Sequence, residues 1–282
     1  MRKIRAFIAA AALMVVFVLS AHMVTSGLSL RVDNGRFGFW FNPYKDLSYS
    51  ALSENIDSDT VLVMGSSEFR HGRGSKYHPR NALRTEDADL MLIGGPCNQI
   101  LFHSIAAGSL EKKLESRKVI LLVSPTWFKK DGVNPVNYGL RFSESEYIQF
   151  MQNPDIESET KKYVAERSEK LLADNNKFRT KVSIVNRYLV DGRKGFISRM
   201  LFKAERLFAF DRDRVSVAMA VKRISKKNDL KFSLDTISNE AFDLMVSQAE
   251  EESLKASDNP FDISDKSWNR KFSKTYEADK NA

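Results

Sequence analysis

The sequence has little cysteine and little histidine, and both shortages restrict its chemistry. Its 282 residues include one cysteine, Cys97, and four histidines. A single cysteine excludes an intramolecular disulfide bond and a zinc site built from several cysteines. Cysteine usage therefore leaves the redox compartment undetermined. The sequence also shows no internal repeat and no pattern typical of a metal or nucleotide site, so we expect no metal and no cofactor.

Acidic residues are fewer than basic ones, 36 against 44, which gives a formal net charge of +8. An excess of positive charge favours an anionic partner such as membrane lipid, a phosphate-bearing polymer or nucleic acid. The sign of the charge does not choose among them. Hydrophobic residues make up 43% of the chain and charged residues 28%, which is typical of an ordered globular protein.

Asp, Glu, Lys and Arg are all absent from residues 6–30, and three basic residues precede this stretch. It is long enough to cross a bilayer, with its basic end in the cytoplasm. The alternative is a cleaved signal peptide, because the most apolar part, residues 7–19, is short and Leu-Ser-Ala follows at residues 19–21. Either alternative places the rest of the chain outside the cytoplasm, where nucleic acid is not the expected partner.

Three short apolar runs follow, at residues 61–64, 90–93 and 119–123. Continuous apolar runs of this length predict buried parallel strands. Between the second and third runs, residues 98–116 carry apolar side chains near helical spacing. The order strand, helix, strand predicts a doubly wound α/β fold.

Beyond about Ser143 the sequence changes to long, charged, helix-prone stretches. Ser143 and Glu146 have the spacing of a capping box. Asn153 before Pro154 predicts a helix N-cap followed by proline at the first helical position. We interpret the charge runs as solvated helix faces. The predicted organisation is an anchor at residues 1–30, an incomplete α/β core at 31–142, a helical region at 143–257 and a polar tail at 258–282.

The segment VLVMGSSEFR, residues 61–70, ends the first predicted strand with a glycine and two serines. Open α/β sheets bind ligands at the carboxyl ends of their parallel strands. Ser67 would lie there, near backbone N–H groups that stabilise an oxyanion, after a sharp turn at Gly65. The alternative is an ordinary connection in which Ser66 or Ser67 caps the next helix.

Four short motifs distinguish this chain from a generic α/β protein. They are GSSEF at residues 65–69, YHP at 77–79, GGPCNQ at 94–99 and VSPTWF at 123–128. In order and approximate spacing they resemble blocks of the DltD family, the D-alanyl transfer proteins of lipoteichoic acid modification. The resemblance is specific as far as residue 128 and diffuse beyond it. It implies an SGNH-hydrolase-like parallel sheet with helices, a helical insertion in the second half, and one N-terminal transmembrane helix.

The resemblance also implies roles for individual residues. Ser67 matches the family nucleophile and would supply one oxyanion N–H, while the loop at residues 94–99 would supply another, from Cys97. The family usually has glycine there, and cysteine would be strained if that position needs a positive φ. We expect the Cys97 side chain to be small and buried rather than a reactive thiol. The expected substrate-binding residues are Glu68, His78, Gln99 and Trp127.

Histidine raises the main difficulty. The resemblance implies a base near the C-terminus, in an Asp-x-x-His motif, but the last histidine here is His103, which we expect on the helix after the second strand, either packed or half exposed. A serine hydroxyl without a base is a poor nucleophile. We therefore expect that the sequence lacks the final third of a DltD-like protein. His78 is expected to fix its loop or face the substrate, and Trp127 either shapes a groove or packs in the core.

These observations predict a single-pass cell-membrane protein whose main domain lies outside the cytoplasm. What the resemblance implies is transfer of D-alanyl groups to lipoteichoic acid through an ester on Ser67. The implied partners are that polyanion, a membrane-embedded acyltransferase, a D-alanyl carrier protein and membrane lipid. One alternative is a non-catalytic protein that positions these partners. Another is an SGNH esterase or thioesterase that acts on a small ester.

Overall fold

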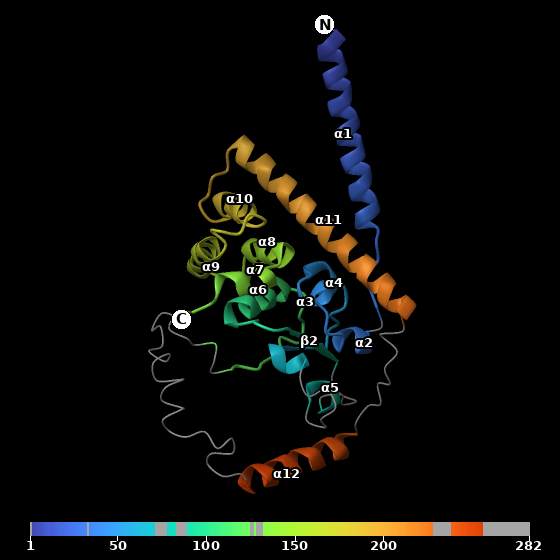
Figure 1. Cartoon of the computed structure of the whole chain (residues 1–282), viewed down its shortest axis with the longest axis vertical. Coiled ribbons are helices and arrows are strands. Elements are labelled where there is room, and N and C mark those ends of the chain that lie inside the picture. The colour runs from blue at the N-terminus through green and yellow to red at the C-terminus, as the bar shows by residue number, and fades with distance from the viewer. Residues whose placement is uncertain are drawn as a thin grey trace.

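A computed structural model describes most of the chain (Figure 1). The described residues are 2–32, 34–70, 78–82, 89–124, 127, 132–227 and 238–255. The first elements are α1 (Arg2–Ser26), α2 (Asn34–Gly38), α3 (Pro43–Asp46), α4 (Tyr49–Glu54), β1 (Val61–Gly65), η1 (Ser67–Arg70), α5 (Pro79–Ala82) and β2 (Leu90–Gly94). The later elements are α6 (Ile100–Leu110), β3 (Val119–Leu121), α7 (Pro135–Arg141), α8 (Glu144–Gln152), α9 (Ser158–Leu171), α10 (Arg179–Leu189), α11 (Phe196–Lys227) and α12 (Asn239–Lys255).

The described strands form one parallel sheet in the order β2, β1, β3. β1 and β2 are in register from Val61 opposite Leu90 to Gly65 opposite Gly94. Alternate side chains of these two strands enter different apolar clusters on the two faces of the sheet. Both faces are therefore covered, as the continuous apolar runs predicted. The prediction of an α/β fold with a parallel sheet is confirmed.

The prediction for the third strand was only partly correct. β3 runs parallel to β1, but its side chains are 38–45% exposed, so the prediction that this strand is buried was wrong. An apolar run indicates which side chains are available for burial, but it does not show what packs on them. In the part of the chain that the structure describes, β3 pairs with β1 alone and forms an open edge.

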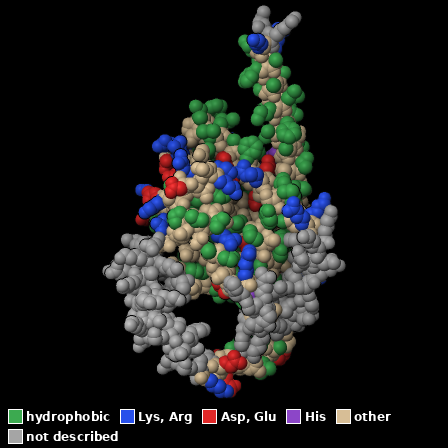
Figure 2. All heavy atoms as spheres, in the orientation of Figure 1, with side chains coloured by type: hydrophobic (Ala, Val, Ile, Leu, Met, Phe, Trp, Pro, Cys, Tyr) green, Lys and Arg blue, Asp and Glu red, His purple; other side chains and the backbone are tan. Residues whose placement is uncertain are grey.

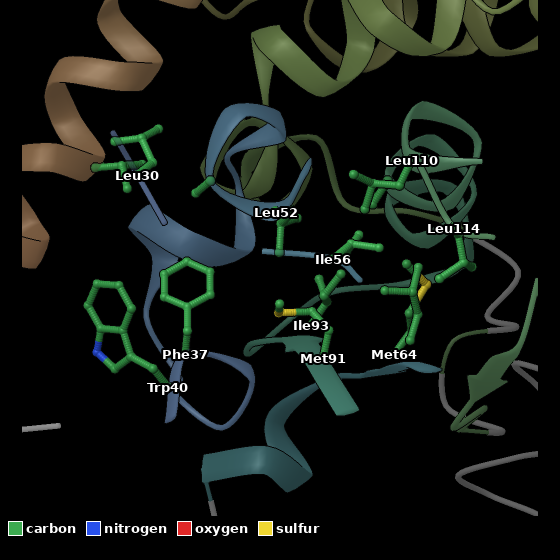
Figure 3. Packing of buried hydrophobic residues seen from close by; sticks show 14 of the residues in the cluster. Leu30, Phe37, Trp40, Leu52, Ile56, Met64, Met91, Ile93, Leu110 and Leu114 are labelled. Atoms are coloured by element: carbon green, nitrogen blue, oxygen red, sulfur yellow. The ribbon is translucent and has the colours of Figure 1, made fainter. Parts of the chain in front are cut away.

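Helices from both halves of the chain cover the sheet. Figure 3 shows Phe37 of α2 and Leu52 of α4 near Ile93 of β2, and Leu110 of α6 above Met64 of β1. Val217 and Ala220 of α11 join the same cluster. The α/β part and the helical part therefore share buried apolar surface, which is the main source of stability in such a fold.

The helical second half confirms one predicted cap and corrects another. Ser143 caps α8, and its side chain accepts a hydrogen bond from the Glu146 N–H at 3.2 Å. The prediction that Asn153 caps a following helix was wrong, because α9 begins later, at Ser158. Asn153 instead ends α8, donating its backbone N–H to Phe150, while its side chain accepts from the Asp155 N–H at 3.0 Å.

The predicted membrane segment forms the apolar helix α1. Residues Lys3–Ser26 are long and apolar enough to cross a membrane, and their side chains lie outside the core. Only the C-terminal end of α1 is fixed to the domain. Asp211 of α11 contacts His22 at 2.9 Å and accepts a hydrogen bond from Thr25 at 2.6 Å.

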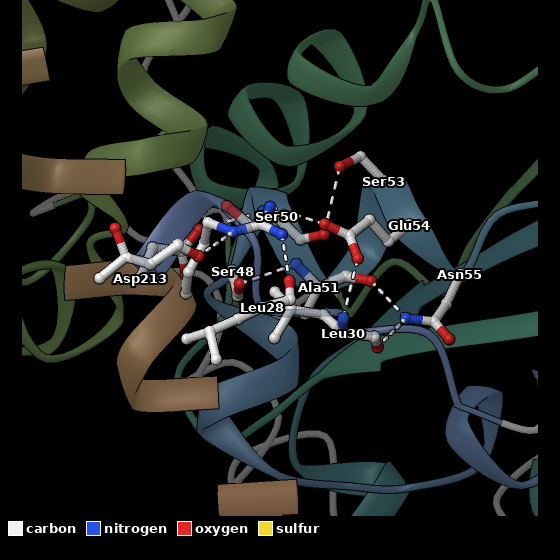
Figure 4. A network of polar contacts seen from close by, with 11 residues as sticks. Leu28, Leu30, Ser48, Ser50, Ala51, Ser53, Glu54, Asn55 and Asp213 are labelled. Carbon is white, nitrogen blue, oxygen red and sulfur yellow. Dashed lines mark hydrogen bonds and ion pairs between the residues drawn. The ribbon is translucent and has the colours of Figure 1, made fainter. Parts of the chain in front are cut away.

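A partly buried polar network joins the segment after α1 to α4 and α11 (Figure 4). Glu54 accepts hydrogen bonds from the Leu30 N–H at 2.9 Å and from Arg214 at 2.6 Å. Asp213 accepts from the Ser50 N–H at 3.0 Å. Because backbone groups and charged side chains satisfy one another here, the network holds the three segments in one arrangement.

Candidate active site

The two serines after β1 have different environments. Ser66 is buried, donates its hydroxyl to the Gly95 carbonyl at 3.3 Å, and donates its N–H to Glu68 Oε1 at 2.6 Å. Ser67 begins η1 and is partly exposed. Of the two hydroxyls, the Ser67 hydroxyl is therefore the one that a substrate can approach. It lies just beyond the carboxyl end of the central strand.

Two glycines allow the strand ends to approach this closely. A Cβ atom at Gly65 would lie 2.5 Å from Glu68 Oε1 and 2.8 Å from the Phe69 ring. A Cβ atom at Gly94 would lie 2.4 Å from the Gly65 carbonyl oxygen and 2.7 Å from Phe69. No side chain fits at either position without displacing backbone or the buried ring. Close packing therefore explains why the GSSEF and GGPCNQ motifs have glycine at positions 65 and 94.

The loop at residues 94–99 makes a tight turn next to these serines. The Asn98 N–H donates to the Gly95 carbonyl at 3.0 Å, and Cys97 has φ 69°. A positive φ at Cys97 explains why glycine suits this position. The prediction that Cys97 is buried was wrong, because the turn leaves its side chain exposed.

Two arginines give this loop a positive environment that the sequence analysis missed. Arg141 Nε donates to the Pro96 carbonyl at 2.8 Å, and its Nη1 lies 3.3 Å from the place where a Gly95 Cβ would stand. Burial and, after it, the charge of Arg70 lower the pKa of Arg141. Among the described residues, buried Nε and Nη2 of Arg70 have no hydrogen-bond partner. Unpaired guanidinium donors favour an anion.

Lys45 and Asp46 form a buried ion pair, and the charges of Arg70 and Arg141 act on Asp46. Lys45 is fully buried, lies 3.3 Å from Asp46, and donates to the carbonyls of Gly38 and Leu92. Burial raises the pKa of Asp46 to about 6, although the charges of Lys45 and both arginines oppose the shift. No sequence pattern identified this pair, since buried lysine is rare and depends on distant carbonyl groups.

His103 packs beneath the site rather than lining it. It is buried on α6, and its ring centroid lies 5.6 Å from that of Trp127. Burial lowers the pKa of His103 to about 4, and the Gly65 backbone carbonyl opposes this shift only in part. The prediction that His103 lies on the helix after the second strand is confirmed, and of its two alternatives the packed one holds. The contact also supports the packing alternative for Trp127.

The remaining predicted residues lie around the same strand ends. Gln99 precedes α6, and its buried Oε1 has no hydrogen-bond donor among the described residues. His78 is buried against Phe41 at 5.9 Å, and Phe41 in turn lies 5.5 Å from Phe69 of η1. The carboxylate of Glu68 accepts a hydrogen bond from the Ser66 backbone N–H. Tyr77 and Phe128 of the predicted motifs, and the predicted tail at residues 258–282, lie outside the described residues.

The fold and the site define an α/β protein with an accessible serine at the carboxyl end of its central parallel strand and, beside it, a loop that contacts the guanidinium group of Arg141. The family model described as DltD protein matches residues 42–282. The chain therefore belongs to the DltD family, as the four motifs indicated.

Three proteins with the name Protein DltD are similar to the chain. The Staphylococcus aureus (strain NCTC 8325 / PS 47) protein is 28% identical over 107 residues, 37% of this chain and 27% of that protein. The Bacillus subtilis (strain 168) protein is 28% identical over 122 residues, which are 43% of this chain and 31% of that protein. The Lacticaseibacillus rhamnosus protein is 27% identical over 119 residues, which are 42% of this chain and 26% of that protein. The match thus spans about a quarter to a third of these relatives.

Proposed function

We propose that this protein transfers D-alanyl groups to lipoteichoic acid at the outer face of the membrane, through an ester on Ser67. The observation that carries the proposal is the position of Ser67, which is partly exposed at the end of the central strand in a chain of the DltD family. α1 supports a location at the membrane, because it is apolar over a bilayer-spanning length.

In this proposal Ser67 Oγ attacks the carbonyl carbon of an activated D-alanyl group. The backbone N–H groups of Ser67 and Cys97 stabilise the oxyanion, the bond to the donor breaks, and the donor leaves with the serine proton. A polymer hydroxyl then attacks the ester and returns a proton to Ser67. The described residues include no base hydrogen-bonded to Ser67, so the proposal requires one from elsewhere.

The surroundings of Ser67 suit both substrates. Arg70 and Arg141 carry positive charge that favours the phosphate groups of a polyanionic acceptor. The amide oxygens of Asn98 and Gln99 are buried without donors among the described residues. The ammonium group of an alanyl ester is a donor of the kind these oxygens need. A membrane-embedded acyltransferase and a D-alanyl carrier protein complete the proposed system.

Replacing Ser67 tests the proposal. In cells that lack the native protein, wild type should restore the D-alanine ester content of the envelope and Ser67→Ala should lower it at least tenfold, because the ester has no oxygen to form on. Ser66→Ala is the matched control, since Ser66 is buried beside the same strand end. It should retain most of the ester content at equal protein level.

A non-catalytic role is the second candidate, favoured because no described base contacts Ser67. A protein that only positions the acyltransferase and carrier would keep the ester content unchanged with Ser67→Ala. Deletion of the whole protein would still lower it. That pair of results would refute the covalent mechanism while retaining a role in the same process.

A further inference from the structure

The first two turns of α11 carry an apolar surface that nothing in the described structure covers. Residue positions 196, 197, 200 and 201 share one face of the helix. Their side chains are 78%, 73%, 54% and 50% exposed: Phe196, Ile197, Met200 and Leu201. The opposite face is packed, because the ring of Phe202 stacks on Tyr188 at 4.6 Å. We call residues 196–203 the α11 tip.

Basic side chains surround this apolar face. Between residues 187 and 206 the sequence has six lysines and arginines and two acidic residues. Figure 2 shows the hydrophobic cluster at the upper end of the body, with lysine and arginine side chains below and beside it. Apolar side chains flanked by Lys and Arg are typical of helices that enter the interface of an anionic bilayer.

The position of the tip relative to α1 selects lipid as the occupant. In Figure 1, α11 passes beneath the base of α1, and its N-terminal end lies level with the lower part of α1. His22 and Thr25 near the end of α1 contact Asp211 of α11. Asp211 lies 15 residues after Phe196, which corresponds to about 22 Å of helix.

We propose that the α11 tip inserts into the outer leaflet beside α1 as a second membrane contact. The proposal relies on the membrane location in the proposed function. Arg214 of α11 helps to fix the orientation of α1 relative to α11, because it donates to the carbonyl of Thr25 at 3.0 Å as well as to Glu54. A bilayer that contains α1 therefore meets the tip while the domain stays in one orientation.

Spin labels on the full chain test the insertion. With Cys97→Ser removing the native thiol, a nitroxide is attached at Ile197→Cys, at Val15→Cys in α1, or at Val136→Cys in α7, where the native side chain is 70% exposed. Each protein is reconstituted into phosphatidylglycerol and phosphatidylcholine vesicles without other proteins. Collisions with oxygen, which concentrates in lipid, are compared with collisions with a water-soluble nickel chelate.

The labels at Val15 and Ile197 should give an oxygen-to-nickel ratio severalfold above that at Val136. A lipid-like ratio at Val15 with a water-like ratio at Ile197 would overturn the insertion while leaving the anchor intact, and would leave a protein partner to cover the tip. A water-like ratio at Val15 would refute the membrane location itself. Lys194→Gln with Arg199→Gln should lower the Ile197 ratio, and a ratio insensitive to these changes would contradict the electrostatic part.

Discussion

Cys97 occupies a backbone conformation that glycine adopts without strain. Its φ of 69° costs a side-chain-bearing residue about 1–2 kcal/mol. We predict that Cys97→Gly is more stable to denaturant than Cys97→Ala, by up to about 1 kcal/mol, since glycine also loses more chain entropy on folding. Urea titration of the detergent-solubilised chain measures the difference. If Cys97→Gly were less stable than Cys97→Ala, as glycine's entropy cost alone would make it, the loop would carry no strain.

His103 gives the fold a specific sensitivity to acid. Its folded pKa of about 4 lies below the unfolded value near 6.5, so only the unfolded chain binds this proton between those pH values. Stability from this group is therefore complete above pH 6.5 and is lost as the pH falls toward 4.

We predict that His103→Phe removes this loss. The stability of the variant relative to wild type should rise by as much as about 3 kcal/mol between pH 7.5 and pH 4. Urea titration of both proteins across this range measures the difference in their free energies of unfolding, in which the contributions of the other titrating groups cancel. Parallel pH profiles would mean that His103 is not buried as a neutral ring.

At the scale of elements, Arg214 is the residue that joins α1 and α4 to α11. It donates to the carbonyls of Thr25 and Leu28 and pairs with Glu54. We predict that Arg214→Ala destabilises the domain by about 2 kcal/mol, because it leaves three partly buried acceptors unpaired. Thermal unfolding monitored by circular dichroism provides the measurement.

Arg212 is the matched control on the same helix. Its side chain is half exposed where it pairs with Glu144 and Glu205. Exposed pairs of this kind contribute at most about 1 kcal/mol, so Arg212→Ala should unfold near the wild-type temperature. Similar losses for the two arginines would contradict a special role for the network.

Elements could be predicted from the sequence where their signals are local. The runs at β1 and β2 were identified because both strands are apolar on both faces, and the Ser143 cap because its partner is three residues away. Asn153 was misplaced because the same residue type ends one helix as readily as it begins another. The exposure of β3 depends on which segments pack against it, and an apolar run by itself does not predict those contacts.

At the scale of the whole molecule, the site combines a local motif with distant residues. The serines, glycines and turn of the candidate site lie in short motifs that the sequence analysis found. Arg141 reaches the Pro96 carbonyl from 45 residues downstream, and the Lys45 pair is buried against β2. Such contacts arise from tertiary packing, so they were found only in the structure.

The central claim is that Ser67 carries the D-alanyl group. The most direct measurement is mass spectrometry of the peptide that contains Ser67, taken from protein isolated at low pH, where esters persist, from cells with an active D-alanylation system. The proposal predicts an alanyl adduct on Ser67 that hydroxylamine removes and that Ser67→Ala lacks. An unmodified Ser67 peptide, in cells whose lipoteichoic acid acquires D-alanine only when this protein is present, would contradict it.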